Sequence, residues 1–200
     1  MPCVINCWNK PIANINDSYF DGYYKDIWKQ VIPEDLTRKE VGFMIPYFSL
    51  GTNSKVLDLM CGHGRHALAL GREGITVTAI DNLTEYIEEI RQTASAEHLP
   101  VDAIQTAVLD YQPASGFDLV LCMGNSFNFF TPDEAARLLT LIAAALKHGG
   151  KFLLNSWSLA ETAYPRFTAE SSSKLGTMEL KTQNKFFFDP ARIETHSTII

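Results

Sequence analysis

Residues 57–66 read LDLMCGHGRH, and this stretch decides the fold. Two glycines, Gly62 and Gly64, follow the apolar run 55–60, which is typical of a buried parallel strand. The residues after them, RHALALGREG (65–74), have the pattern of a helix that ends at a glycine. The glycines are therefore predicted to lie in a turn from strand to helix, where backbone can approach a ligand closely.

Further along the chain, strand candidates alternate with helix candidates. We expect strands at 55–60, 75–80, 102–108, 117–123 and 151–156, and helices at 64–72, 84–97 and 132–147. Thr84 and Thr131 are expected to cap two of these helices, and Gly149 with Gly150 to end the last one. Such alternation predicts an α/β fold, a Rossmann-like doubly wound sheet of mostly parallel strands with helices on both faces.

Two flanking segments complete the predicted organisation. Residues 14–50 are rich in aromatic residues and broken by prolines, which predicts an N-terminal helical segment at 1–50 before the core at 51–156. Residues 157–200 are predicted to form a loop on the substrate side and a C-terminal antiparallel hairpin. The sequence ends in mid-strand, so we expect either a truncated version of a longer enzyme or an uncovered edge at 151–156. Self-association is expected in both cases.

Composition restricts the classes of function. A chain of 200 residues, 46% of them hydrophobic, can form one domain with a sizeable core. A net charge of −6 without a basic stripe argues against nucleic acid and favours a small-molecule substrate. No apolar run approaches the roughly 18 residues of a membrane span, and the N-terminus lacks the features of a secretory signal, so we expect a cytoplasmic protein.

Two of the four cysteines are expected to be reduced core residues. Cys61 and Cys122 stand in apolar, strand-like sequence that suits small buried side chains. Cys3 and Cys7 have no second pair of Cys or His nearby at a spacing typical of zinc sites. We therefore predict no metal site.

Two ligand classes use a glycine-rich turn after the first strand of such a sheet: dinucleotides and S-adenosylmethionine. The stretch GHGRHA (62–67) satisfies the dinucleotide fingerprint, with alanine in its last position. Asp58 favours the second class, because a carboxylate there would repel a pyrophosphate but attract the positive sulfonium and ammonium groups of S-adenosylmethionine. A purely structural role, in which Asp58 caps the turn, stays open.

Two further acids end the next strands. Asp81 ends the strand candidate GITVTAID (74–81) about 20 residues after the glycines, the position from which a carboxylate accepts the ribose hydroxyls of either ligand. Asp110 follows the third strand, where a carboxylate can accept from the exocyclic amine of adenine. A helix cap or a solvated turn residue is the alternative for Asp110.

Four stretches, in this order and spacing, resemble the class I S-adenosylmethionine-dependent methyltransferases, and more narrowly their bacterial small-molecule branch. They are VLDLMCGHGRHALAL (56–70), VTAID (77–81), VLDY (108–111) and FDLVLCMGNSFNFF (117–130). The resemblance covers roughly residues 15–200. It implies a methionine-side loop at Asp58, Met60, Gly62 and Gly64, a ribose site at Asp81, an adenine site at Asn82, Leu109 and Asp110, and a backbone contact from Met123.

Three positions qualify the resemblance. The family usually has glycine at Met60, so this side chain must point away from the ligand. Arg65 and His66 are common in the branch, but an ion pair and simple packing explain them equally well, so they receive no catalytic role.

The stretch YFDGYYKDIW (19–28) resembles the family's lid helix, in which a tyrosine can touch the cofactor carboxylate. Tyr19 or Tyr23 is the candidate for that contact.

The resemblance implies an enzyme that transfers a methyl group to an O, N or C atom of a small-molecule acceptor by in-line displacement. GNSFNFF (124–130) replaces the Asn-Pro-Pro-aromatic sequence of DNA adenine methyltransferases, which removes that substrate class. No residue stands out as a general base, so no catalytic residue is assigned. Two alternatives remain: a nicotinamide-dependent oxidoreductase, and a non-catalytic S-adenosylmethionine-binding module.

Overall fold

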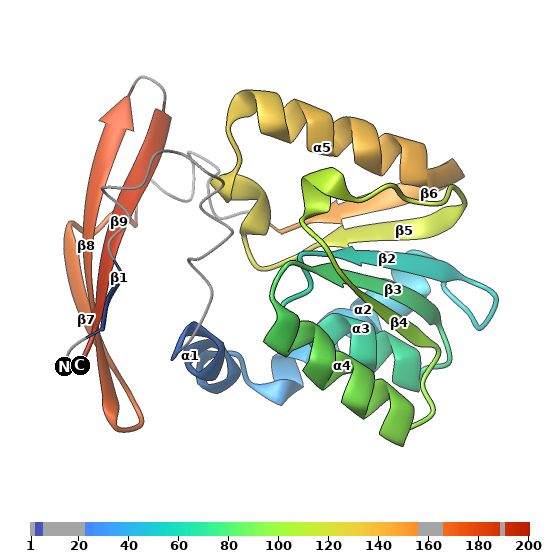
Figure 1. Ribbon diagram of the computed structural model, residues 1–200, viewed down its shortest axis with the longest axis horizontal. Coiled ribbons are helices and arrows are strands. Elements are labelled where there is room, and N and C mark those ends of the chain that lie inside the picture. The colour runs from blue at the N-terminus through green and yellow to red at the C-terminus, as the bar shows by residue number, and fades with distance from the viewer. Residues whose placement is uncertain (1–2, 6–22, 156–165, 189–190) are drawn as a thin grey trace. The chain divides into compact units, whose positions relative to one another are not determined.

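The computed structural model describes residues 3–5, 23–155, 166–188 and 191–200 (Figure 1). The chain divides into two compact units, Ile32–Ser156 and a second unit of Met1–Val31 with Trp157–Ile200. We call them the parallel unit and the antiparallel unit after their sheets. The predicted division at residues 50 and 156 stays a prediction.

The parallel unit is built on five strands. These are β2 (Lys55–Leu59), β3 (Thr76–Asp81), β4 (Val101–Gln105), β5 (Phe117–Cys122) and β6 (Leu146–Leu154). Their order is β4-β3-β2-β5-β6, and every neighbouring pair is parallel. Because β3 and β5 flank β2 on opposite sides, the strand order reverses at β2, and ligands bind beside such a switch point in open α/β sheets. The predicted fold class is confirmed.

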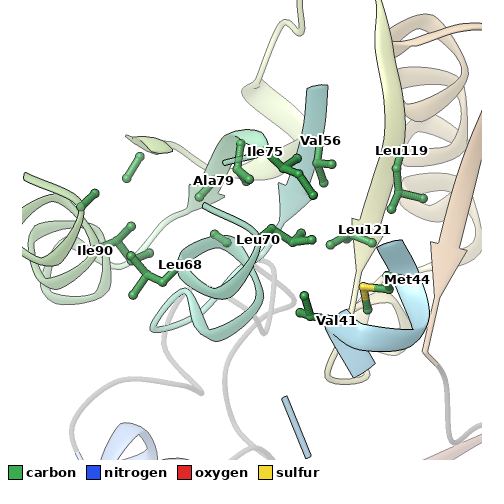
Figure 2. Packing of buried hydrophobic residues seen from close by; sticks show 14 of the residues in the cluster. Val41, Met44, Val56, Leu68, Leu70, Ile75, Ala79, Ile90, Leu119 and Leu121 are labelled. Carbon is green, nitrogen blue, oxygen red and sulfur yellow. The ribbon is translucent and has the colours of Figure 1, made fainter. Parts of the chain in front are cut away.

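Helices cover both faces of this sheet, as predicted. Helices α2 (Glu34–Tyr47), α3 (Arg65–Arg72) and α4 (Thr84–Ala96) pack on one face against alternate strand residues such as Val56 and Leu119 (Figure 2). Helix α5 (Pro132–Ala145) packs on the other face against residues such as Leu57 and Val120. Successive strand residues point to opposite faces, so Val56 and Leu57 belong to different clusters.

The predicted cap of α5 is confirmed and that of α4 is wrong. Thr131 forms a reciprocal capping box with Glu134. The N-cap of α4 is Leu83, without a side-chain cap. The Thr84 hydroxyl instead accepts a hydrogen bond from Gln105 Nε2 at 2.8 Å, which holds it against the end of β4.

Helix α5 ends earlier than predicted. Its last residue is Ala145, and Gly149 and Gly150 lie inside β6. A Cβ atom at Gly150 would lie 2.9 Å from the carbonyl oxygen of Phe117, so the close approach of β5 requires this glycine.

The described residues of the antiparallel unit form helix α1 (Tyr23–Val31) and four strands. These are β1 (Cys3–Ile5), β7 (Glu170–Leu175), β8 (Met178–Phe188) and β9 (Ala191–Ile199), in the order β1-β9-β8-β7. The predicted hairpin is confirmed as β8 and β9. Strands β1 and β7 were not predicted, since one is three residues long and the other reads ESSSKL.

Two further expectations concern edges and membranes. Strand β6 lies at an edge of the five-stranded sheet, whereas self-association through that edge stays a prediction. Among the helices that the structure describes, none combines the length and apolar character needed to cross a lipid bilayer.

Candidate functional site

The turn between β2 and α3 has left-handed backbone at three of its residues. The φ angles are 54° at Met60, 57° at Gly62 and 74° at Gly64. A Cβ atom at Gly64 would lie 2.5 Å from Cγ1 of Ile90, whereas one at Gly62 would meet nothing within 4 Å. Packing against α4 and backbone conformation both require Gly64, while backbone conformation alone favours glycine at Gly62.

Met60 takes up a conformation that favours glycine. A residue with a side chain is destabilised there by roughly 1–2 kcal/mol. The half-buried Met60 side chain packs against the cluster on the α5 face, which includes Leu59 and Val120. The departure from the family pattern is thus accommodated by turning the side chain into the core.

Asp81 fastens this turn. Its Oδ2 accepts a hydrogen bond from the Gly62 N–H at 2.9 Å, and its Oδ1 accepts one from the Leu83 N–H at 3.0 Å. Burial raises the pKa of Asp81, and these N–H groups oppose that effect. Each carboxylate oxygen retains a second lone pair, so acceptance from ribose hydroxyls stays compatible with these bonds. The fastening role was not predicted from the sequence.

Asp58 is the most deeply buried acid of the site. Its side chain is 1% exposed, and its Oδ2 has no hydrogen-bond partner. Burial raises the pKa of Asp58 to about 6; the charges of His66 and Arg65 act in the opposite direction. A buried polar atom without a partner is costly, and it marks a position suited to a bound group.

Arg65 and His66 share one partner that the sequence did not reveal. The Arg65 guanidinium and the His66 Nε2 both contact Oε2 of Glu40 on α2, His66 at 2.9 Å. Arg65 also donates to Thr37 Oγ1 at 3.0 Å. The ion pair considered for Arg65 is present, whereas His66 is buried and contacts Glu40 rather than only packing. A signal was present, because the first turn of α3 carries two basic residues and no acid.

The remaining predicted site residues follow β3, β4 and β5. Asn82 and Leu109 are half-buried, and Asp110 is exposed at the end of a 3-10 helix, Val108–Asp110. Met123 is half-buried and packs against the cluster of Figure 2. These strands are parallel to β2, so their carboxyl ends share one edge of the sheet. The topology therefore brings these residues to the same edge as Asp58 and Asp81.

The structure tests neither of the two candidate tyrosines. Tyr19 lies outside the described residues, and Tyr23 begins α1 in the antiparallel unit. Their predicted contact with the cofactor stays a prediction. Beyond β5, Asn125 has a left-handed φ of 69°, and Phe127 and Phe130 pack against the cluster on the α5 face.

The cysteines of the parallel unit are free. Burial raises the pKa of Cys122 to about 12 and that of Cys61 well above its ordinary value, so both thiols are protonated at neutral pH. The described residues contain no group of three or more His, Cys, Asp or Glu that could hold a metal ion.

Known proteins match this chain in sequence and fold. Residues 56–150 match the family described as "Methyltransferase domain". The S-adenosyl-L-methionine-dependent Diels-Alderase iccD of Talaromyces variabilis is 29% identical over 142 residues, which are 68% of this chain and 47% of that protein. The glycine N-methyltransferase of Oryctolagus cuniculus is 27% identical over 158 residues, 70% of this chain and 53% of that protein. The chain thus spans about half the length of these relatives.

A solved structure extends the likeness beyond the parallel unit. The S-adenosylmethionine-dependent methyltransferase of Clostridium acetobutylicum superposes with a TM-score of 0.69 at 17% identity, covering 87% of this chain and 77% of that chain. The fold is thus that of the class I S-adenosylmethionine-dependent methyltransferases, and residues 56–150 resemble a methyltransferase domain in sequence.

Proposed function

We propose that the chain is an enzyme that transfers the methyl group of S-adenosylmethionine to a small-molecule acceptor. The observation that carries this proposal is the turn 60–64, fastened by Asp81 and close in sequence to the unpartnered carboxylate oxygen of Asp58. A ligand with both a ribose and a positive charge suits these two acids. A dinucleotide pyrophosphate does not, because the buried Asp58 carboxylate would repel it.

The residues proposed to hold the cofactor lie along the carboxyl edge of the parallel sheet. The methionine side of the cofactor is assigned to the turn residues Asp58, Met60, Gly62 and Gly64, and the ribose to Asp81. The adenine is assigned to Asn82, Leu109 and Asp110. Met123 is proposed to line the site through its backbone. Tyr19 or Tyr23 remains the candidate for the cofactor carboxylate.

The proposed reaction needs position more than proton transfer. When bound, S-adenosylmethionine would supply a methyl group on a sulfonium, and the acceptor's nucleophile would attack this methyl carbon in line as the thioether S-adenosylhomocysteine leaves. Alignment of two bound reactants lowers a barrier by roughly 7–11 kcal/mol, so the rigid turn accounts for much of the chain's contribution. Asp58 would hold the positive end of the ligand through charge. No general base is assigned.

A small molecule is the proposed acceptor. The net charge of −6 disfavours a nucleic-acid substrate, and one relative is named for the methylation of glycine. Another relative is named for a Diels-Alder reaction that depends on S-adenosylmethionine. Methyl transfer therefore needs a test separate from cofactor binding.

Calorimetry with S-adenosylhomocysteine and NADH tests the cofactor. We expect binding of S-adenosylhomocysteine and none of NADH, and the reverse would establish the oxidoreductase alternative. A screen of small hydroxyl, amine and carbon nucleophiles with methyl-labelled cofactor then tests transfer. Cofactor binding without labelled product across the screen would favour a binding module or another reaction.

The proposal extends to location and assembly. A cytoplasmic location agrees with the free thiols of Cys61 and Cys122, because reducing compartments keep cysteines unpaired. Self-association is proposed to use the edge strand β6, whose Leu154 is partly exposed. Sedimentation at several concentrations checks this, and a monomer throughout would contradict it.

A further inference from the structure

Helix α3 begins with an arrangement of charge that is unfavourable in isolation. Its N-cap is Gly64, which has no side chain to cap the helix, and its first turn contains no acid. Arg65 and His66 stand there instead. The N-terminal end of a helix carries partial positive charge, so basic side chains at this position are stabilised only by acids from other elements.

Two acids from other elements meet this need. Glu40 of α2 contacts both Arg65 and His66 through Oε2. The His66 hydrogen bond, assisted by the Arg65 guanidinium, lowers the pKa of Glu40 to about 2. The second acid is Asp58 of β2, on which the charges of His66 and Arg65 also act. One pair of basic residues is therefore shared electrostatically between two carboxylates.

Arg65 and His66 interact unequally with the two carboxylates, because both contact Glu40 directly. Asp58 Oδ2 is buried without a partner, although it interacts electrostatically with both basic side chains. The position of Glu40 is secured by its own helix, since Val41 and Met44 are buried in the core cluster of Figure 2. Helix α2 thus presents Glu40 from a fixed position.

We propose that Glu40 is a positioning residue that holds Arg65 and His66 away from Asp58 and so keeps the Asp58 carboxylate available to a cationic ligand. This inference rests on the proposed function, because the ligand is the positively charged methionine part of the cofactor. Without Glu40, the side chains of Arg65 and His66, whose charges already act on Asp58, are released to compensate its buried carboxylate, and they compete with the ligand.

Glu40→Gln is the direct test, because it keeps size and polarity while removing the charge. S-adenosylhomocysteine carries the ammonium, and adenosine lacks the methionine part altogether. We expect Glu40→Gln to lower the affinity for S-adenosylhomocysteine about tenfold in calorimetry, the loss typical of one charged hydrogen bond. The affinity for adenosine should stay nearly unchanged. Equal losses for the two ligands, or no loss, would overturn the proposal.

Two further variants distinguish competition between Arg65 and the ligand for Asp58 from a general loosening of the site. Glu40→Gln combined with Arg65→Gln removes the competitor and is expected to recover most of the lost affinity; no recovery argues against the proposal. Glu97→Gln is the matched control, because Glu97 also binds an arginine of α3, Arg72, through two hydrogen bonds of 2.7 Å, but at the exposed far end of the helix. It should leave both affinities unchanged.

Two outcomes complete the design. If Glu40→Gln does not fold, the single variant Arg65→Gln tests the proposal instead. This variant should bind S-adenosylhomocysteine at least as tightly as the parent. A tenfold loss of affinity would overturn the proposal. If the parent chain binds neither ligand, the proposed function fails and this inference fails with it. A parent that binds while Glu40→Gln binds equally well refutes only the role of Glu40.

Discussion

Among the described residues, the two units of the molecule differ in whether they bury charged side chains. In the parallel unit, Asp58 and Asp81 are buried at 1% and 7% exposure. In the antiparallel unit, the pair Arg192–Glu194 has side chains 41% and 33% exposed. Burying a carboxylate is costly, and strongly shifted acids collect at functional sites. The contrast therefore indicates where the chain gives up stability for function.

The apolar core is divided just as unequally. Of the described residues in the antiparallel unit, the buried apolar ones are Ile27 and Ile199, whereas two clusters fill the faces of the parallel sheet. Substitutions at the turn 60–64 should therefore change stability and binding strongly. Substitutions at surface charges of the antiparallel sheet should change little.

The largest effect is expected for Gly64→Ala. The added Cβ would take up left-handed backbone and meet Ile90, so strain and overpacking together should lower the free energy of unfolding by about 2–4 kcal/mol. Gly62→Ala is the matched control, and with strain alone it should lose about 1–2 kcal/mol. Urea unfolding measures both. Equal losses would show that the contact with α4 does not matter.

Asp58→Asn should stabilise the ligand-free protein at neutral pH. The pKa of Asp58 is about 6 in the folded chain and ordinarily 3.8, so its stabilising contribution is complete below pH 3.8 and is lost as pH rises through 6. The difference between the two pKa values corresponds to about 3 kcal/mol in the free energy of unfolding. The parent loses this amount between low and high pH, and the variant does not.

Unfolding at pH 4 and pH 8 is the measurement for Asp58→Asn. The advantage of the variant should be larger at pH 8, while its affinity for S-adenosylhomocysteine falls. A variant less stable than the parent at pH 8 would show that the Asp58 carboxylate is already satisfied without ligand.

Asp81→Ala should weaken the binding of S-adenosylhomocysteine by about 1.5–3 kcal/mol, the range for hydrogen bonds to a charged group. It should also loosen the turn, because the Gly62 N–H loses its acceptor. Calorimetry with adenosine separates the two effects, since adenosine keeps the ribose and lacks the methionine side. Unchanged affinity for adenosine would refute the ribose assignment.

Much of the parallel unit could be predicted because its signals are local. The run 55–60 and the alternation after it predicted strands and helices that the structure confirms within a few residues. Position after a strand also predicted that Asp58 and Asp81 meet at one edge, since carboxyl ends of parallel strands lie together.

The failures share a different cause, namely contacts between residues far apart in sequence. Glu40 lies 25 residues before Arg65, and no local pattern joins them. The sequence predicts Gly150 as a helix terminator, whereas the structure shows the backbone of Phe117 beside it. Strand β7 has a polar, serine-rich sequence and exists because β8 pairs with it.

The smallest effects are expected at Arg192 and Glu194 on β9, and they test the other half of the contrast between the units. Glu194→Ala should change the free energy of unfolding by less than about 0.5 kcal/mol, because an exposed ion pair gains little over water and is screened by salt. Arg192→Ala should cost about 0.5–1 kcal/mol, since its guanidinium also lies 4.1 Å from the ring centre of Phe187. Unfolding at low and high salt separates the ion pair from the ring contact, because salt weakens the ion pair more.

A loss above about 2 kcal/mol in the free energy of unfolding for Glu194→Ala would exceed what exposed pairs provide. It would mean that this surface of the antiparallel sheet is covered in solution, and that charge is buried in both units.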